Sequence, residues 1–166
     1  IVPLKSSLAI KLNATPAKNQ LSWSFGKGDA TAAGDFGDPR VGDDYAFCLY
    51  GDTDTTPTLL VDVAFPAGGM CAAGKPCWKA KGNPLGAKGY AYAQKAYATL
   101  ALTPGAAGNA KIAVKLKGTA FAAPTLPATA FPLRAQLQGA GRCWDTTFVA
   151  DGVQTNTTTQ LKAKGP

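Results

Sequence analysis

The first twelve residues, IVPLKSSLAIKL, alternate between apolar and polar positions. Their apolar side chains share even positions, with Ser6 the interruption: Val2, Leu4, Leu8, Ile10 and Leu12. This period of two predicts a half-buried β-strand over residues 1–12. Such a strand either belongs to the chain's own sheet or completes the sheet of a neighbouring copy.

Similar alternation recurs along the chain, separated by turns rich in Gly, Pro and Asp. It predicts strands near residues 21–28, 45–50, 59–65 and 111–117, and a hairpin-like unit over 133–148. YAYAQKAYATLAL is ambiguous between a short helix and a strand, and the proline-rich FAAPTLPATAFP predicts an extended crossing segment or an edge. We therefore expect an antiparallel β-sandwich of about eight strands, with a barrel as the lesser alternative.

The composition supports a β fold and excludes several kinds of catalytic site. All ten acidic residues are Asp, and the chain has no Glu and no His. Without Glu, the surfaces of amphipathic helices lack one of their usual residues. Without His, a Ser/His/Asp or Cys/His nucleophile cannot be built, and paired aspartates alone do not identify a catalytic cleft. We expect no enzyme, no catalytic residues and no membrane-spanning segment, since no apolar run approaches about 18 residues.

Four cysteines, Cys48, Cys71, Cys77 and Cys143, favour two disulfides and an exported protein over a four-thiolate zinc site. The loop CAAGKPC contains Gly74 and Pro76, which suit a tight turn, so we pair Cys71 with Cys77. Elimination then pairs Cys48 with Cys143. The chain begins with Ile, which fits a cleaved signal peptide and an extracellular location.

Charge is divided along the sequence. Eight Asp and one Arg lie between Asp29 and Asp62, whereas the chain as a whole carries +7. An acidic block of this kind is unusual for a nucleic-acid binder, and the sequence has no recognition motif, so we expect no nucleic-acid partner. The Asp-rich turns offer a possible calcium site, in which the candidate ligands are Asp35, Asp38, Asp43, Asp44, Asp52 and Asp54. Turn aspartates that bond to their own backbone explain the same residues, and we predict no firm metal or other cofactor.

Several motifs together resemble a known type of domain. FGDP, YAFCLYG, PAGGMCAAGKPCW, GNAKIAVKLKG, APTLP and LRAQLQGAGRCWDTTF follow one another in the order found in a β-rich domain of exported proteins from deltaproteobacteria and other environmental bacteria. The resemblance covers about residues 20–150 and is carried by the order of the cysteines, the CW pairs and the lysine strand. It implies export, a sandwich-like fold and cysteines used as cross-links. It implies no activity.

On this basis we divide the chain into three parts: an amino-terminal strand extension (1–14), a β-sandwich domain (15–150) and a Thr-rich carboxy-terminal extension (151–166). The leading hypothesis is a subunit of an extracellular filament or pilus, a homopolymer in which the first strand is donated to the next copy. Val2, Leu4, Leu8, Ile10 and Leu12 would then be the assembly residues. The segment 153–161 also alternates, so it is a second candidate for the donated strand.

The alternative is a secreted binding module for glycans or a cell surface. Aromatic side chains suited to stacking on sugars are Trp23, Trp78, Trp144, Tyr90, Tyr92 and Tyr97. Against this, Trp78 and Trp144 each follow a cysteine directly and would cover a disulfide inside the fold. N-A-T at Asn13 and N-T-T at Asn156 match the glycosylation acceptor pattern.

Overall fold

The computed structural model describes residues 1–51, 56–71, 74–94 and 97–166. Its regular structure consists of antiparallel strands and short 3₁₀ turns, with no α-helix in the described residues. The 3₁₀ turns are η1 (Pro16–Lys18), η2 (Ala33–Phe36), η4 (Gly118–Ala120) and η5 (Ala150–Gly152). The all-β, antiparallel prediction is therefore confirmed.

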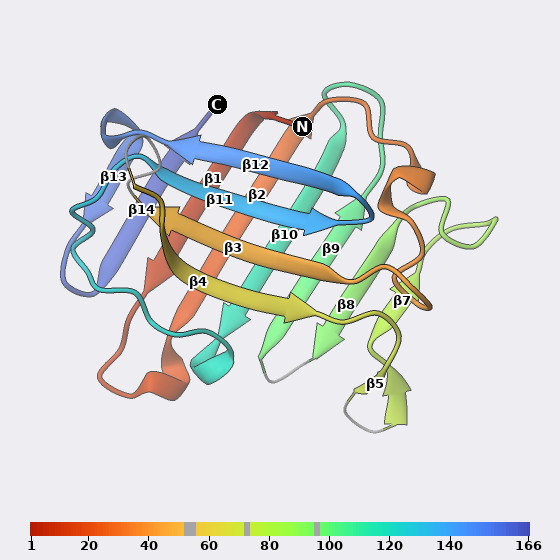
Figure 1. Cartoon of the computed structure of the whole chain (residues 1–166), viewed down its shortest axis with the longest axis horizontal. Coiled ribbons are helices and arrows are strands. Elements are labelled where there is room, and N and C mark those ends of the chain that lie inside the picture. Colours follow the sequence, from red (N-terminus) through yellow and green to blue (C-terminus); the bar gives the residue numbers. More distant parts are fainter. Residues whose placement is uncertain (52–55, 72–73, 95–96) are drawn as a thin grey trace.

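Eight strands form one large sheet (Figure 1). In spatial order they are β13 (Val153–Asn156), β14 (Gln160–Gly165), β1 (Pro3–Lys11), β2 (Gln20–Gly28), β10 (Ala110–Lys117), β9 (Ala98–Thr103), β8 (Tyr90–Gln94) and β7 (Trp78–Ala80). The ambiguous segment YAYAQKAYATLAL contributes β8 and β9, which pair antiparallel.

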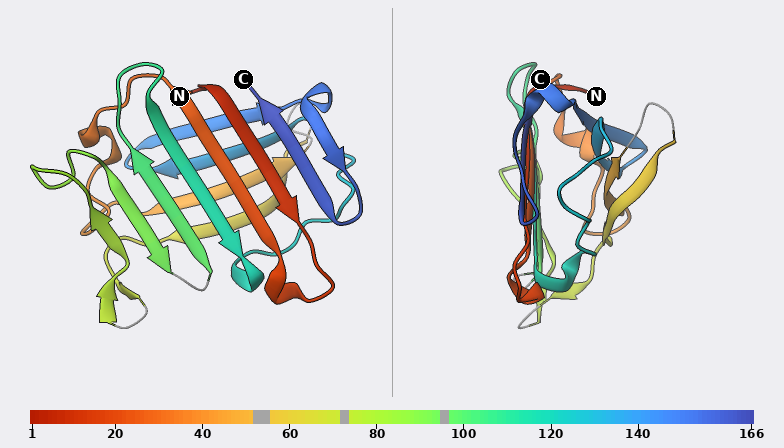
Figure 2. Two further views of the ribbon diagram at one scale, coloured as in Figure 1. Left: turned by 180° about the vertical axis from the view of Figure 1, so that it is seen from behind. Right: turned by 90° about the vertical axis from the view of Figure 1, so that its left-hand side faces the viewer.

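Four further strands form a second sheet, which crosses in front of the first at a steep angle (Figures 1 and 2). Their order is β12 (Arg142–Phe148), β11 (Leu133–Gly139), β3 (Tyr45–Gly51) and β4 (Thr58–Phe65). A small hairpin of β5 (Met70–Cys71) and β6 (Lys75–Pro76) lies at one end. The proline-rich segment contributes no strand, and the Asn156 side chain holds it by bonding both the N–H and the C=O of Ala128.

The core lies between the two sheets, because each strand turns alternate side chains inward. From β2, Trp23 and Phe25 are each only 1% exposed, and from β3 Phe47 is fully buried. The rings of Trp23 and Phe47 meet across the sheets with centroids 5.6 Å apart. This contact shows that the two sheets share a single core.

The amino-terminal strand lies inside this fold. β1 pairs with β2 on one side and with β14 on the other. Leu8 and Ile10 are each 1% exposed, whereas Val2 and Leu4 are 60% and 74% exposed. Hence the alternation over 1–12 was assigned correctly to a strand, but the strand completes the chain's own sheet. The segments called extensions, 1–14 and 151–166, supply three strands of the large sheet rather than lying outside the sandwich.

The two sheets are also linked at one end by residue Ile1. Its amino group donates to the carbonyl of Cys143 (3.2 Å), and its carbonyl accepts from the N–H of Asp145 (3.1 Å). Both partners lie on β12, the edge strand of the small sheet. The amino-terminal segment therefore belongs to the large sheet and covers part of the edge of the small one.

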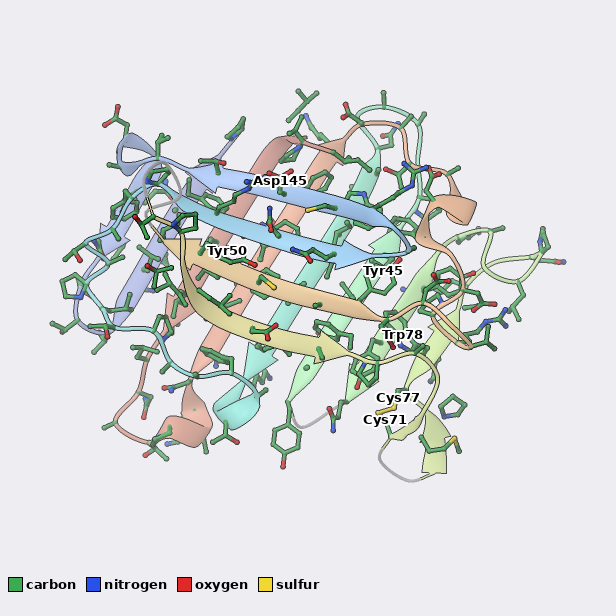
Figure 3. The ribbon with its side chains drawn as sticks, viewed as in Figure 1. Tyr45, Tyr50, Cys71, Cys77, Trp78 and Asp145 are labelled. Atoms are coloured by element: carbon green, nitrogen blue, oxygen red, sulfur yellow. A yellow bond between two sulfur atoms is a disulfide. The ribbon has the colours of Figure 1, made fainter. Side chains whose placement is uncertain are left out.

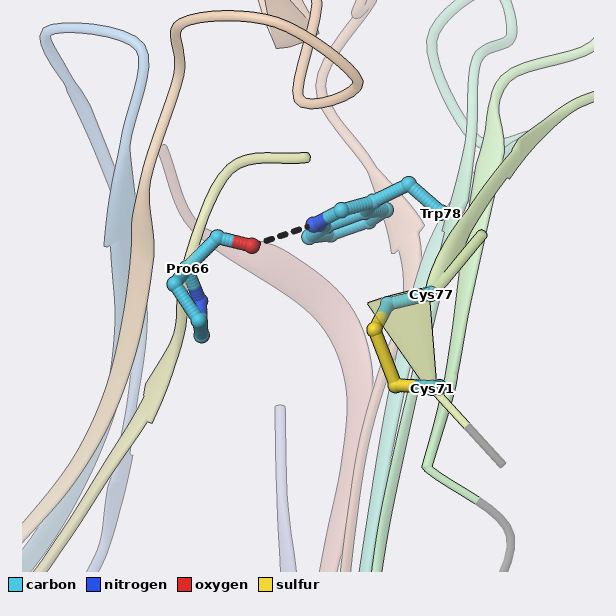
Figure 4. Close-up of a disulfide and its surroundings, with 4 residues drawn as sticks. All are labelled: Pro66, Cys71, Cys77 and Trp78. Atoms are coloured by element: carbon cyan, nitrogen blue, oxygen red, sulfur yellow. Dashed lines mark hydrogen bonds between the residues drawn. A yellow bond between two sulfur atoms is a disulfide. The ribbon is translucent and has the colours of Figure 1, made fainter. Parts of the chain in front are cut away.

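Of the two expected disulfides, one is present. Cys71 and Cys77 are bonded across the β5–β6 hairpin, with Cα atoms 4.9 Å apart (Figure 4). The second pairing is wrong: Cys48 and Cys143 are both free. They lie on β3 and β12, which are separated by β11, so about two strand spacings of 4.8 Å part them. A disulfide requires Cα atoms within about 6.8 Å.

Candidate functional site: a lysine-walled groove on the large sheet

The outer face of the large sheet is strongly basic. Its eight strands, all given above, contain nine lysines and no acidic residue: Lys5, Lys11, Lys27, Lys79, Lys111, Lys115, Lys117, Lys162 and Lys164. Apart from Lys27, which has φ of 52° near a bulge, these lysines occupy the positions that alternate with buried residues. Their exposed side chains therefore point away from the core, on the face seen directly in Figure 2, left.

The small sheet carries no such excess. Within its strands, Arg134 and Arg142 balance Asp62 and Asp145. The Arg134 guanidinium donates to Asp145 at 2.8 and 3.0 Å, and Arg142 pairs with Asp35 in η2. The charge division seen along the sequence is thus a division in space. Among the described residues, the acidic side chains lie on the small sheet, as Asp62 and Asp145 do, or in loops, whereas the strands of the large sheet carry only positive charge.

Strand register places the lysines on both sides of a strip of small residues. In one row across the sheet, Lys162 of β14 is followed by Ala9, Ser22 and Lys115. In the next row Lys11 and Lys117 flank Gln20. From the strand spacing, Lys11 and Lys117 start about 10 Å apart across β2, and Lys162 and Lys115 about 14 Å apart across β1 and β2. Small side chains between long ones make a groove.

Two hollows mark this groove along β2. One, of about 440 Å³, is lined by Ser7, Ser24 and Gly26 below and by Lys5, Lys111 and Lys164 at the sides. The other, of about 300 Å³, lies at the opposite end of β2, where Ser22 and Gln20 meet Lys11, Lys115 and Lys117. A third hollow of about 650 Å³ continues past Lys11 and Gln20 to Asn13 and Lys18.

The floor of the groove offers hydroxyl groups. Ser7 on β1 and Ser24 on β2 are direct neighbours, and their Oγ atoms lie 2.7 Å apart in a hydrogen bond. Each hydroxyl has further acceptor or donor capacity toward a ligand. With ammonium groups above and hydroxyls below, the groove suits a ligand that carries both anionic groups and hydroxyls.

Aromatic residues do not contribute to this face. Those in the strands of the large sheet are at most 6% exposed and face the core: Trp23, Phe25, Trp78, Tyr90 and Tyr92. Trp144 is also fully buried, and Trp78 donates its indole N–H to the Pro66 carbonyl at 2.8 Å (Figure 4). Burial of Trp78 and Trp144 agrees with the reading that the sequence favoured, and Trp23, Tyr90 and Tyr92 are likewise buried in the core, where they cannot stack on sugars. Only Tyr97 of the named set is exposed, at 47%.

The aspartates proposed for calcium are used by the loops themselves. Asp43 and Asp44 accept backbone N–H groups of Asp38 and Ala67, both at 2.6 Å. Asp38 pairs with Arg40, whose hydrogen bond holds the pKa of the Asp38 carboxyl below its usual value. Asp35 accepts the Ala32 N–H as well as pairing with an arginine.

No group of three or more His, Cys, Asp or Glu among the described residues is placed to hold a metal ion. Asp52 and Asp54 lie outside the described residues. Of the glycosylation candidates, Asn13 and Asn156 are both exposed. The Oδ1 atom of Asn13 accepts the Thr15 N–H at 2.9 Å.

The free thiols lie on the outer face of the small sheet, the face that carries Tyr50 and Asp145 in Figure 3. Burial raises the pKa of the Cys48 thiol, and its Sγ lies 3.7 Å from Asp62 Oδ1. Desolvation, with a further contribution from Asp145, also raises the pKa of Cys143. Because the thiolate is the reactive form, these shifts oppose a nucleophilic role. Tyr45, on the inner face, also has a raised pKa from burial, and its hydroxyl donates to the Phe36 carbonyl at 2.7 Å.

A scan against protein-family models, a search of curated proteins and a search of solved structures each found no match to this chain. The resemblance to an exported bacterial domain accordingly stays a prediction. The described part of the chain holds no helix with the length and apolar character needed to cross a membrane. Filament assembly through the first strand also stays a hypothesis, and it would require β1 to leave its place between β2 and β14.

The groove itself was missed by sequence reasoning. AKIAVKLKG displays alternate lysines, and KSSLAIKL and QLKAKG do the same at the two ends of the chain. What the sequence did not reveal is that these three segments lie within one sheet, with only the uncharged outer side of β2 between β1 and β10. The signal available in the sequence was that the predicted strands with alternate lysines contain no acidic residue.

Proposed function

We propose that this chain is a binding module that attaches to an anionic polysaccharide through the outer face of its large sheet. The observation that carries the proposal is the segregation of charge: eight strands contain nine lysines and no acidic residue, and all of these lysines except Lys27 point outward on one face. Ammonium groups attract carboxylate and sulfate groups, and a concentrated field of one sign speeds the encounter with a polyanion.

An acidic polysaccharide fits this face better than a nucleic acid does. Single-stranded nucleic acids are bound by stacking bases on aromatic rings, and the rings of these strands face the core. Sugar hydroxyls, by contrast, match the serine hydroxyls of the groove floor. The Cys71–Cys77 disulfide supports an exported protein, because disulfides persist in oxidising compartments, where extracellular polysaccharides also occur.

The proposal is tested by measuring binding to heparin, a sulfated polysaccharide, and to polygalacturonate, a carboxylated one. The test variant replaces Lys111, Lys115 and Lys117 with Gln. The control variant replaces three exposed lysines outside the large sheet with Gln: Lys75, Lys81 and Lys88. Both variants lose three positive charges, so net charge is matched.

If each ammonium group of the face contributes about 0.5 to 1 kcal/mol, the test variant loses roughly 10- to 100-fold in affinity. The control variant should lose less than threefold, and wild-type binding should weaken steeply between about 50 and 200 mM salt. Equal losses in both variants would mean that net charge alone attracts the polymer. That result, or no binding of wild type at 50 mM salt, would refute the proposed function.

A further inference from the structure

We propose that the ligand is a single linear anionic chain that lies along β2, in the groove between the lysines of β10 and those of β1 and β14. This inference rests on the proposed function and deepens it, since a basic face alone would serve a flat anionic surface equally well. The question is whether the ligand sits in the groove or covers the whole face.

The positions of the hollows favour the groove. The hollows of about 440 and 300 Å³ share β2 as their floor, one at each end of the strand. β2 spans nine residues, which corresponds to about 30 Å of continuous floor. From Gln20 to Gly26 the outward residues are Gln20, Ser22, Ser24 and Gly26, none of which is charged or large enough to interrupt a chain. The exposed Lys27 lies beyond them, at the end of the strand.

Charge along the groove favours a repeating anion. On β10, Lys115 and Lys117 are about 7 Å apart and Lys111 lies about 13 Å further along the strand. Opposite them stand Lys11 and Lys5 of β1, near the two ends of the floor. Anionic groups repeated along one polymer would therefore meet ammonium groups on both walls. A compact ligand with a single charge would contact only one end.

The part of the same face beyond β10 distinguishes a chain in the groove from a ligand that covers the whole face. Beyond β10, the outward positions of β9 and β8 are short and uncharged, among them Thr99 and Ala101. In the described strands beyond β10, the first lysine is Lys79 on β7, three strands away and thus about 14 Å distant. A planar anionic surface would reach Lys79 as well as the groove, whereas a chain along β2 would leave it free.

The first experiment fills the groove without changing any charge. Ser22 and Thr99 are the two cross-strand neighbours of Lys115, on its groove side and its far side respectively. Ser22→Tyr should lower affinity for heparin oligosaccharides at least tenfold, and the matched control Thr99→Tyr should change it less than twofold. Tyrosine suits an exposed strand position, and the urea midpoint of each variant checks that it folds.

A second experiment does not depend on any variant. Lysine acetylation is followed by mass spectrometry on the wild-type chain, with and without saturating heparin oligosaccharide. Lys11, Lys111, Lys115 and Lys117 should be protected at least fivefold, and Lys79 should react at the same rate in both samples. Affinity should also rise with oligosaccharide length until the chain spans about 30 Å and then level off.

These outcomes separate the two proposals. If Ser22→Tyr and Thr99→Tyr weaken binding equally, or if Lys79 is protected with the others, the ligand covers the whole face and the groove inference is overturned, while the proposed function stands. Binding to vesicles with 30% anionic lipid as tight as to heparin, with Lys79 protected, would identify a membrane surface and overturn both. Lysines that are protected only in the groove support the single chain.

Discussion

Replacing the buried side chains of β1 with Ala should lower the stability of the monomer, because β1 belongs to the chain's own sheet and does not join one copy to the next. Leu8 and Ile10 are each 1% exposed, and Leu8 lies directly opposite Trp23 on β2. Replacing a buried Leu or Ile with Ala removes contacts and leaves a cavity, which lowers the free energy of unfolding by about 2 to 5 kcal/mol. With urea m-values of about 2 kcal/mol/M, each substitution should lower the midpoint by roughly 1 to 2.5 M.

The chain supplies its own control on the same strand. Val2 and Leu4 belong to the same alternation in the sequence, but they are 60% and 74% exposed. Val2→Ala and Leu4→Ala should each change the free energy of unfolding by less than about 0.5 kcal/mol. The assay is urea denaturation followed by the fluorescence of the three tryptophans, all of which are buried in the folded chain.

The double variant Leu8→Ala with Ile10→Ala sharpens the comparison. The two side chains are neighbours on one face of β1, so their effects need not add, but the combined loss is a large fraction of the roughly 5 to 15 kcal/mol that stabilises a domain. We expect a largely unfolded chain. If β1 were exchanged between copies, the denaturation midpoint of wild type would rise with protein concentration. A concentration-dependent midpoint, or equal effects of Leu8→Ala and Leu4→Ala, would contradict the placement of β1 in its own sheet.

Three further predictions follow from the cysteines and from a buried hydroxyl. Cys48 and Cys143 should each react with a maleimide after denaturation, and two unreactive thiols in the denatured chain would instead indicate a second disulfide. In the native protein their reaction should accelerate only above the usual thiol range near pH 8.5, because burial raises the pKa of both thiols and keeps them protonated at lower pH. Replacing Cys71 and Cys77 with Ser should lower the free energy of unfolding by about 2 kcal/mol, as expected for a short loop, and calorimetry would detect it. Thr146→Val should raise that free energy by about 1 kcal/mol, because Oγ1 of this 2% exposed residue has no hydrogen-bond partner among the described atoms; a lower midpoint would show that the hydroxyl is satisfied.

Local patterns predicted the strands well and their partners poorly. The alternation in AKIAVKLKG and in IVPLKSSLAIKL identified β10 and β1, because each strand that buries one face alternates apolar and polar residues in its own sequence. It contained no information on which strands are neighbours. β1 lies between β2 and β14 because the chain returns at residues 160–165, a long-range pairing that no local period encodes.

The same limit explains the errors at individual side chains. Cys48 and Cys143 were paired by elimination, yet strand order puts β11 between them. The sequence favoured buried positions beside disulfides for Trp78 and Trp144, and both rings are buried, but Trp144 follows the free thiol of Cys143. Apolar bulk and cysteine count are properties of a composition, whereas a pairing or a binding surface depends on topology.

The strand topology also concentrates the positive charge, part of a net charge of +7, on one face of the molecule. The acidic side chains are largely occupied, by Arg40 with Asp38, by Arg134 with Asp145 and by loop N–H groups, so the small sheet presents little uncompensated field. The lysines of the large sheet have no acidic residue in their strands to neutralise them. An approaching polyanion is therefore steered toward the large sheet, so that this face is turned toward the polymer before contact is made. Adding a negative charge to this face should slow association, because it weakens the field that guides the encounter. With Ser22→Asp, in the groove floor, dissociation should also become faster, because the new carboxylate would lie against the bound anion.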